Sequence, residues 1–460
     1  MWDGEPESGY VRCMFSDLTS IFPDTASTLD GELTIGGIRA TELTALFGSP
    51  LLVLDEETIQ SRTRAWIDAF APWEPGCQVA FACKSLCVGA ALELTSAEGA
   101  GADVASAGEL AIARAAGISG QDIVLHGNNK YRADLMFAVR EGVGLIVLDA
   151  PDELDLLEEV VAELQAPPQA VLVRVNPDIE VETHRYIRTG HAGSKFGVCA
   201  DTAQEMLTRA AKSPHLVPRG IHMHLGSQLL SLDPWRQVLT WLGPFARTLA
   251  DAGVPIEVLD LGGGLGIRYL EHQHPPTIRD VANLTMSMIR SAWSEYGLDT
   301  LPQLIVEPGR SIIGNAGVTL YSVGVVKRDG PIGYVNVDGG MSDNPRPMLY
   351  QAEYRCLIAD RATTPPDGKW WIAGVHCESG DVLIEDAPLP APHRGDTLAV
   401  AGTGAYTVSM GSNYNAHPRP AVVMVADGVA QIAVRRESIA DVVCRDVIAA
   451  TSIVSNTVHV

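Results

Sequence analysis

Residues 79–106 read VAFACKSLCVGAALELTSAEGAGADVAS, and this stretch decides the fold. A short apolar run from Val79 to Cys83 is followed by apolar residues at helical spacing from Gly89 to Ala97. A second short run extends from Ala102 to Ser106. A strand, a helix and a second strand in this order form the repeating unit of a parallel sheet. The same alternation continues as far as Arg310.

We expect eight strands in this part of the chain, with helices between them. Eight parallel strands with intervening helices over roughly 250 residues predict a closed (β/α)₈ barrel of the TIM type, with its chemistry at the carboxyl ends of the strands. A doubly wound open sheet is the alternative architecture. The expected strands are Val79–Cys83, Ala102–Ser106, Asp122–Gly127, Leu145–Asp149, Ala170–Asn176, Gly220–Leu225, Glu257–Leu261 and Leu304–Glu307. The expected helices are Gly89–Ala97, Gly108–Ala116, Tyr131–Arg140, Asp152–Leu164, Thr202–Ala211, Pro234–Ala252 and Thr277–Tyr296.

After Arg310 the pattern changes to alternating apolar and polar residues broken by Gly and Pro, which is typical of antiparallel strands. The first 45 residues include a strand or hairpin at Leu33–Ile38 and are too short to fold alone. We therefore predict a barrel domain at residues 46–312. A mainly antiparallel β-sandwich or β-barrel domain would comprise residues 1–45 and 313–460. Its clearest strands are Gly317–Val326, Gly333–Val337, Lys369–Val375 and Ala421–Ala426.

The composition favours a globular chain that acts on a small molecule. Of the 460 residues 46% are hydrophobic and 19% charged, and 33 basic against 56 acidic residues give a net charge of −23. Such a charge repels phosphate backbones and anionic lipids, so we expect neither a nucleic-acid nor a membrane partner. Residues 1–17 carry Asp3, Glu5, Glu7 and Arg12 and lack the apolar segment of a signal peptide, which favours the cytoplasm.

Lys84 follows the first predicted barrel strand, in the sequence Phe81-Ala-Cys-Lys-Ser85. A partly desolvated lysine can lose its proton, attack a carbonyl group and form a Schiff base. Taken alone, such a lysine is more simply explained as a surface residue beyond a buried strand.

Two histidines, His222 and His224, lie on the same side of the sixth predicted strand because side chains alternate along an extended chain. They could form half of a metal site. Two ligands are too few, however, and neither an H-E-x-x-H motif nor a nearby carboxylate cluster completes them, so we expect no metal. The alternative is an imidazole that packs flat on an aromatic cofactor.

The last two predicted strands end in glycine-rich and basic segments, Gly262-Gly-Gly-Leu-Gly266 and Glu307-Pro-Gly-Arg310. This is the usual position of the phosphate site of a barrel, although a simple tight turn would also use these glycines. The spacing does not match a dinucleotide fingerprint. A lysine, a histidine, a phosphate site and the carboxylate of Glu307 are together what pyridoxal phosphate needs, because a carboxylate at the pyridine nitrogen keeps it protonated.

The motifs then identify a family resemblance that extends over nearly the whole chain. The sequence resembles the fold-type III pyridoxal-phosphate decarboxylases, whose barrel is like that of alanine racemase, and within them the diaminopimelate decarboxylase group. The first set of motifs is FACKSL at Lys84, GADVASAGEL from Gly101, HGNNK from His126, SKFG from Ser194, HMHLGSQ from His222, GGGLG from Gly262 and EPGR from Glu307. The second set is DGGMSDNPRPMLY from Asp338, CESGD from Cys377 and GAYTVSMGSNYN from Gly404.

The resemblance implies decarboxylation of meso-2,6-diaminopimelate to L-lysine and carbon dioxide, the final step of lysine biosynthesis. It implies Lys84 as the Schiff-base lysine and Cys377 as the proton donor. Further cofactor-binding residues would be His224, which stacks on the ring, Ser227, Gly263, Gly264, Glu307, Gly309, Arg310 and Tyr406. Substrate-binding residues would be Arg310, Arg346, Tyr350, Glu378 and Tyr406. A dicarboxylic diamino substrate needs a cation and an anion at its distal end, and Arg346 and Glu378 meet that demand.

The resemblance further implies a homodimer in which Cys377 and Glu378 of one subunit reach into the barrel of the other. Taken singly, each of these residues has an ordinary explanation as a packed side chain or a structural ion pair. The residues around Lys84 depart from the family's usual Tyr-Ala-x-Lys-Ala-Asn pattern, which leaves the lysine in place but alters its packing. Two alternatives stay open: a decarboxylase of the same fold acting on another or a carrier-tethered amino acid, and a non-catalytic pyridoxal-phosphate-binding protein.

Overall fold

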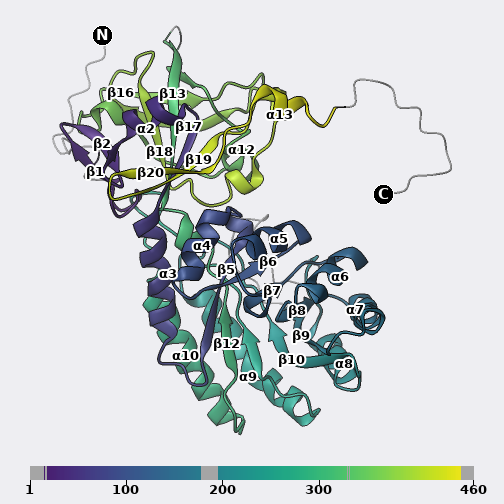
Figure 1. The fold of residues 1–460 in the computed structure, drawn as a ribbon. Coiled ribbons are helices and arrows are strands. Elements are labelled where there is room, and N and C mark those ends of the chain that lie inside the picture. The colour runs from purple at the N-terminus through teal and green to yellow at the C-terminus, as the bar shows by residue number, and fades with distance from the viewer. Residues whose placement is uncertain (1–14, 16–17, 178–194, 329, 331, 447–460) are drawn as a thin grey trace, which may run out of the picture.

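The central part of the chain forms a closed barrel of parallel strands, as the sequence predicts (Figure 1). The computed structural model describes residues 15, 18–177, 195–328, 330 and 332–446. Strands follow one another around the barrel in chain order, and the last pairs in parallel with the first, which excludes the open doubly wound sheet. The strands are β5 (Cys77–Ala82), β6 (Gly101–Val104), β7 (Ile123–Leu125), β8 (Leu145–Leu148), β9 (Gln169–Arg174), β10 (Leu216–His222), β11 (Val258–Asp260) and β12 (Gln303–Val306).

Apolar side chains fill the inside of the barrel, and helices cover its outside (Figure 1). The first covering helix begins where the Asp55 carboxylate accepts the backbone N–H of Thr58 at 3.0 Å. The interior is packed with Ala80, Val124, Val147, Leu172, Val258 and Ile305. The helices are α3 (Glu56–Phe70), α4 (Gly89–Ala97), α5 (Ala107–Ala115), α6 (Arg132–Arg140), α7 (Pro151–Leu164), α8 (Ala200–Ala210), α9 (Asp233–Asp251) and α10 (Ile278–Glu295), with α11 (Arg310–Ile313) after β12.

The second domain is built on a nine-stranded, mostly antiparallel sheet. Its parallel pairs are β14 with β16 and β4 with β19. Its strands are β4 (Leu51–Asp55), β13 (Gly317–Lys327), β14 (Tyr334–Val337), β15 (Cys356–Ile358), β16 (Gly368–Ala373), β17 (Val382–Leu389), β18 (Thr397–Ala401), β19 (Ala421–Ala426) and β20 (Val429–Val434). A small separate sheet holds β1 (Ser27–Leu29), β2 (Glu32–Ile35) and β3 (Ile38–Arg39), and the helices are α2 (Ala40–Phe47), α12 (Arg346–Tyr350) and α13 (Ile439–Val443).

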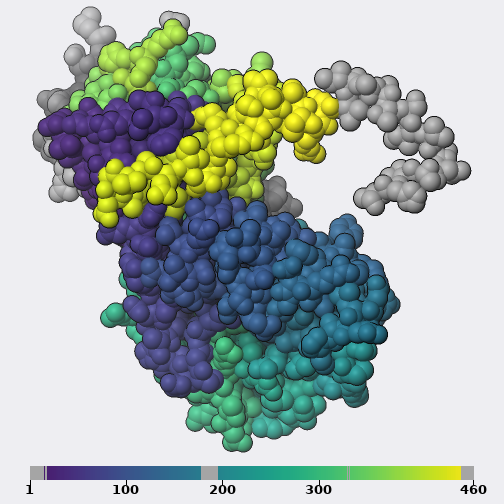
Figure 2. Space-filling model, viewed as in Figure 1, coloured from purple at the N-terminus to yellow at the C-terminus, as the bar shows by residue number. Residues whose placement is uncertain are grey.

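Strand β4 joins the second domain rather than the barrel. It pairs with β13 and β19, although the sequence-based limit at residue 46 assigns it to the barrel. All five of its residues are buried, so the alternating pattern that marks a half-buried strand is missing from the sequence. We propose that the barrel part of the chain begins after β4, with α3. Figure 2 shows the consequence, since the purple N-terminal and yellow C-terminal segments lie side by side on this domain.

The second domain contacts the barrel at the carboxyl ends of its strands. The backbone N–H of Tyr406 donates to the carbonyl of Ser85 at 2.7 Å, directly beside Lys84. The backbone N–H of Gly404 likewise donates to Gly314 at 3.1 Å. The barrel mouth is therefore covered by residues from the second domain. Among the described helices, none has both the length and the apolar composition that crossing a bilayer would require.

Candidate active site

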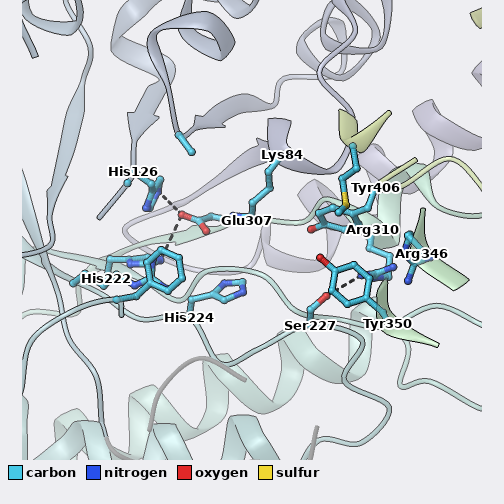
Figure 3. Close-up of a pocket in the computed structure, with 15 residues that line it drawn as sticks. Lys84, His126, His222, His224, Ser227, Glu307, Arg310, Arg346, Tyr350 and Tyr406 are labelled. Atoms are coloured by element: carbon cyan, nitrogen blue, oxygen red, sulfur yellow. Dashed lines mark hydrogen bonds and ion pairs between the residues drawn. The ribbon is translucent and has the colours of Figure 1, made fainter. Parts of the chain in front are cut away.

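A cavity of about 390 Å³ lies at the carboxyl ends of the barrel strands, beneath the second domain (Figure 3). Most of the predicted site residues line it, and they come from both domains. The barrel contributes Lys84, Ala105, His126, Gly127, Arg174, Phe196, His222, His224, Ser227, Glu307 and Arg310, and the second domain contributes Arg346, Tyr350, Tyr406 and Met410. A smaller pocket beside it is lined by Gly264 and Gly309, with Lys84, Ser227 and Arg310 among its other residues.

Lys84 lies in the short 3₁₀ turn η1 (Cys83–Ser85) that follows β5. Its ammonium group donates to Asp103 Oδ2 at 2.8 Å, and its side chain leaves 40% of its surface exposed to the cavity, whereas Asp103 exposes 1%. Burial disfavours the charged amine, but the carboxylates of Asp103 and Glu307 raise the pKa of Lys84 above its ordinary value. The amine is therefore protonated at neutral pH and held in position by its ion pair with Asp103.

Glu307 follows β12 and lies on the opposite side of the cavity from Arg310 and Arg346 (Figure 3). His126 Nε2 lies 2.7 Å and His222 Nε2 3.7 Å from Glu307 Oε1. Burial alone would raise the pKa of this carboxyl group, but the two histidines outweigh it and hold the pKa well below the usual range. Glu307 therefore presents a permanent negative charge in a buried site.

Acid pH is expected to destabilise the folded chain through His222. Burial lowers the pKa of His222 from 6.5 to about 3. The unfolded chain binds this proton below pH 6.5 while the folded chain does not, so stability falls as pH drops from 6.5 towards 3. Thermal unfolding followed between pH 7 and 4 measures this slope, which is expected to be shallower in His222→Phe. The exposed His274→Phe variant is the control, and equal slopes in wild type and His222→Phe would contradict the assignment.

His224 lies just beyond β10 and faces the cavity near Lys84 (Figure 3). The backbone N–H of Gly263 donates to His224 Nδ1 at 3.3 Å, which leaves the ring hydrogen on Nε2. Burial, together with the charges of Lys84 and Arg174, lowers the pKa of His224 well below its ordinary value. The ring is therefore neutral and held in one orientation, which suits packing against an aromatic group.

The glycine-rich segment after β11 passes so close to its neighbours that side chains are excluded. A Cβ atom at Gly263 would lie 2.2 Å from the carbonyl oxygen of Glu307, and one at Gly264 2.7 Å from that of Gly226. Gly264 also has a φ of +119°, which other residues rarely adopt. A Cβ at Gly309 would lie 2.8 Å from Ser85 Oγ. Bare backbone therefore lines the small pocket, as an anion site made of peptide N–H groups requires.

Tyr269 joins two buried arginines at the opposite end of the cavity. Its hydroxyl accepts from Arg310 Nη1 at 2.6 Å and from Arg346 Nη1 at 3.0 Å. Although burial raises the pKa of Tyr269, the two guanidinium groups outweigh it and the net shift is downward. Arg310 also donates from Nη2 to Ser227 Oγ at 3.0 Å. Two cations are thus fixed side by side without a carboxylate partner among the described residues, so they are suited to bind an incoming carboxylate or phosphate.

Several residues of the site are not predicted from the sequence. Asp103 and His126 lie inside quoted motifs, GADVASAGEL and HGNNK, but no role was inferred for either. An acidic residue in the otherwise apolar strand β6 is a signal that could have identified Asp103. Tyr269 carries no such signal, because only the fold brings it between Arg310 and Arg346. The start of the predicted SKFG motif, Ser194, lies outside the described residues.

Cys377 and Glu378 do not line the cavity of their own chain. They lie in the turn between β16 and β17, and both are exposed. The turn itself is well ordered by hydrogen bonds: the buried Asp381 carboxylate accepts the backbone N–H groups of Met341 at 2.7 Å and of His376 at 2.9 Å. The turn thus has a defined shape although the side chains of Cys377 and Glu378 are exposed.

The donor set of the cavity fits pyridoxal phosphate. A primary amine, a buried carboxylate, a neutral imidazole and a pocket lined by bare backbone match the aldehyde, the ring nitrogen, the ring face and the phosphate of that cofactor. His126, His222, Asp260 and Glu307 also lie within 4.8 Å of one another, as metal ligands do. Since His126 Nε2 already lies 2.7 Å from Glu307 Oε1, we interpret this cluster as a buried set of interacting histidine and carboxyl groups.

The comparisons with known proteins agree with this geometry. The family model "Pyridoxal-dependent decarboxylase, pyridoxal binding domain" matches residues 56–314. Diaminopimelate decarboxylase of Halalkalibacterium halodurans is 42% identical over 422 residues, which cover 90% of this chain and 95% of that protein. The Bacillus subtilis enzyme of the same name is 40% identical, with 90% and 95% covered. Crystal structures of diaminopimelate decarboxylase from M. jannaschii, one with L-lysine, have a TM-score of 0.87 at 33% identity and cover 93% of this chain and 98% of theirs.

Proposed function

Because the chain belongs to the diaminopimelate decarboxylase family of pyridoxal-dependent enzymes, we propose that it binds pyridoxal 5′-phosphate and converts meso-2,6-diaminopimelate to L-lysine and carbon dioxide. The observation that carries the proposal is the cavity itself. It combines Lys84 and Glu307 at one end with Arg310 and Arg346 at the other, which matches a cofactor beside a dicarboxylic substrate. We place the reaction in the cytoplasm as part of the same proposal.

The cofactor would be held by residues of the barrel. The Lys84 amine would bond to its aldehyde, Glu307 would face the ring nitrogen and His224 the ring. When bound, the cofactor supplies a protonated pyridine ring that accepts the electron pair left by departing carbon dioxide. The permanent negative charge of Glu307 keeps that ring nitrogen protonated. The phosphate would lie on Ser227, Gly263, Gly264, Gly309 and Arg310, with Tyr406 above them.

The substrate would be oriented by the two arginines. A planar guanidinium binds a carboxylate through two parallel hydrogen bonds, so Arg346, supported by Arg310 and Tyr350, would hold the carboxylate that is not lost. The other carboxylate would then lie near Lys84, where the reacting bond is broken. Asp103 would hold the Lys84 side chain in place through their ion pair, and Tyr406 closes the cavity from the second domain.

We propose that the site is completed by a second copy of the chain. Met348, Leu349, Val375 and Tyr414 are large apolar side chains of the second domain that are 39–50% exposed, and exposed apolar side chains that gather in one place are typical of an interface. The Met348 side chain lies against Gly380, in the turn that also contains Glu378. The ring centroid of Tyr414 lies 5.6 Å from that of His376, in the same turn. A twofold homodimer burying this patch would carry Cys377, as proton donor, and Glu378, as partner of the distal ammonium, into the other barrel.

Turnover of a panel of amino acids tests the proposed substrate. We expect kcat/KM for meso-diaminopimelate to exceed that for L-lysine, L-ornithine and L-arginine by at least about 100-fold, because those lack the second carboxylate and would leave Arg346 unpaired. Release of carbon dioxide and formation of L-lysine are measured together. A higher kcat/KM for any other amino acid would overturn the substrate assignment. Bound cofactor without carbon dioxide release from any of them would instead indicate a cofactor-binding protein.

A further inference from the structure

We infer that Asp260 is a neutral carboxylic acid that donates a hydrogen bond to Glu307 and so positions the carboxylate that faces the cofactor. Asp260 is the last residue of β11, and Glu307 follows the neighbouring strand β12. Asp260 does not line the cavity, so it would act through Glu307 rather than on a ligand. The inference rests on the proposed function for the role of Glu307, but the protonation of Asp260 can be tested without it.

The surroundings of Asp260 leave one of its oxygens without a donor. The side chain is fully buried, and its Oδ1 accepts the backbone N–H of Gly262 at 2.9 Å. No described hydrogen-bond donor reaches Oδ2, which is shielded from solvent. An ionised carboxylate oxygen in that position would be an uncompensated buried charge, which proteins avoid. A hydroxyl at Oδ2 would instead be able to donate to Glu307, which lies in the same buried cluster.

The charges in the cluster favour the same distribution of protons. The side chains of Asp260, Glu307, His126 and His222 lie within 4.8 Å of one another, and all are buried. Burial and the charge of Glu307 raise the pKa of Asp260 well above its ordinary value, whereas the histidines lower that of Glu307. Other charged groups that act on Asp260 are Asp103, which favours the neutral acid, and Arg174, which opposes it. Two carboxyl groups whose pKa values are pushed apart in this way hold one proton and one charge.

A neutral Asp260 gives Glu307 a hydrogen-bond donor in addition to the close contact with His126, whose Nε2 lies 2.7 Å from Oε1. A donor from Asp260 would fix the orientation of the carboxylate and help it to stay ionised without contact with water. If Asp260 were charged, it would repel the Glu307 carboxylate and raise the pKa of Glu307. The side-chain amide of asparagine has the same shape as the neutral acid and, like it, one donor group and one acceptor group, whereas leucine has a similar size and neither.

The affinity for pyridoxal phosphate distinguishes a neutral, hydrogen-bonding Asp260 from a charged one. The full-length apo-protein is titrated with the cofactor, and the dissociation constant is measured by fluorescence quenching for wild type, Asp260→Asn and Asp260→Leu. We expect Asp260→Asn to stay close to wild type and Asp260→Leu to bind at least about 10-fold more weakly, as loss of a hydrogen bond to a charged group predicts. Asp55→Asn, at the buried aspartate that caps α3, is the control and is expected to lower stability without changing cofactor affinity.

Infrared spectroscopy tests the protonation directly, in the full-length protein at neutral pH. A carboxylic-acid carbonyl band present in wild type and lost in Asp260→Asn is expected. Absence of that band, or a dissociation constant for Asp260→Asn as weak as that for Asp260→Leu, would overturn the inference. So would a Leu variant that binds the cofactor as wild type does. If wild type failed to decarboxylate diaminopimelate while the band was present, the proposed function would fail and the neutral acid would stand.

Discussion

The Lys84→Ala variant is expected to lose the visible absorption of covalently bound cofactor and to lower kcat for diaminopimelate by at least about 10³-fold, because the side chain would no longer supply a nucleophilic amine. Among the described residues that line the cavity, Lys84 is the one lysine, and its amine lies 2.8 Å from the buried Asp103 carboxylate. No other amine of the cavity could therefore replace it. Absorption spectra of the purified protein with added pyridoxal phosphate, followed by assay of L-lysine formation, measure both effects.

Lys212→Ala is the matched control for this variant. Lys212 is exposed beyond the end of α8 and does not line the cavity, so its replacement is expected to leave spectrum and turnover unchanged. A Lys84→Ala protein that kept both the visible band and near-normal turnover would contradict the role of Lys84.

The second large effect is expected from Cys377→Ala, which would bind the cofactor normally but turn over about 10²-fold to 10³-fold more slowly, as loss of a proton donor predicts. Cofactor binding should be intact because Cys377 is not among the residues proposed to hold the cofactor, which line the cavity of the barrel. Titration with pyridoxal phosphate and steady-state kinetics separate the two properties. The exposed Cys444→Ala variant, in the C-terminal part of the chain, is the control.

Mixing the two inactive variants tests whether sites are shared between subunits. After unfolding and refolding together, a hybrid dimer of Lys84→Ala and Cys377→Ala contains one site with both wild-type residues. Random pairing is expected to restore about a quarter of wild-type activity, since half the dimers are hybrids and each has one intact site. No recovery on mixing, with hybrids demonstrated by differently tagged subunits, would mean that Cys377 acts within its own chain.

Much of the barrel could be predicted from sequence because its signals are local. Each strand is a short apolar run, and each helix has its own apolar spacing, so all eight strands were found with ends shifted by a few residues. Strand β4 was missed as part of the second sheet, because Leu51–Asp55 pairs with segments about 270 and 370 residues away. Nothing within five buried residues indicates such distant partners.

The site was predictable where a residue lies at a strand end and less so where the fold alone brings it in. Lys84, His224, Glu307 and Arg310 follow barrel strands, and the structure brings them to one cavity. Tyr269 depends on the packing of a loop between two arginines, and Asp260 on its distance from Glu307, neither of which the sequence encodes locally. Cys377 and Glu378 are exposed in the single chain, so the role proposed for them depends on the proposed interface with a second copy.

The most direct test of the account is to locate the bond between the chain and its cofactor. The protein is incubated with pyridoxal phosphate, reduced with borohydride and digested, and the labelled peptide is identified by mass spectrometry. The account predicts a single pyridoxyl group on Lys84, within the peptide that contains Phe81 to Leu86. A label on another lysine, or no label in a protein that decarboxylates diaminopimelate, would contradict it.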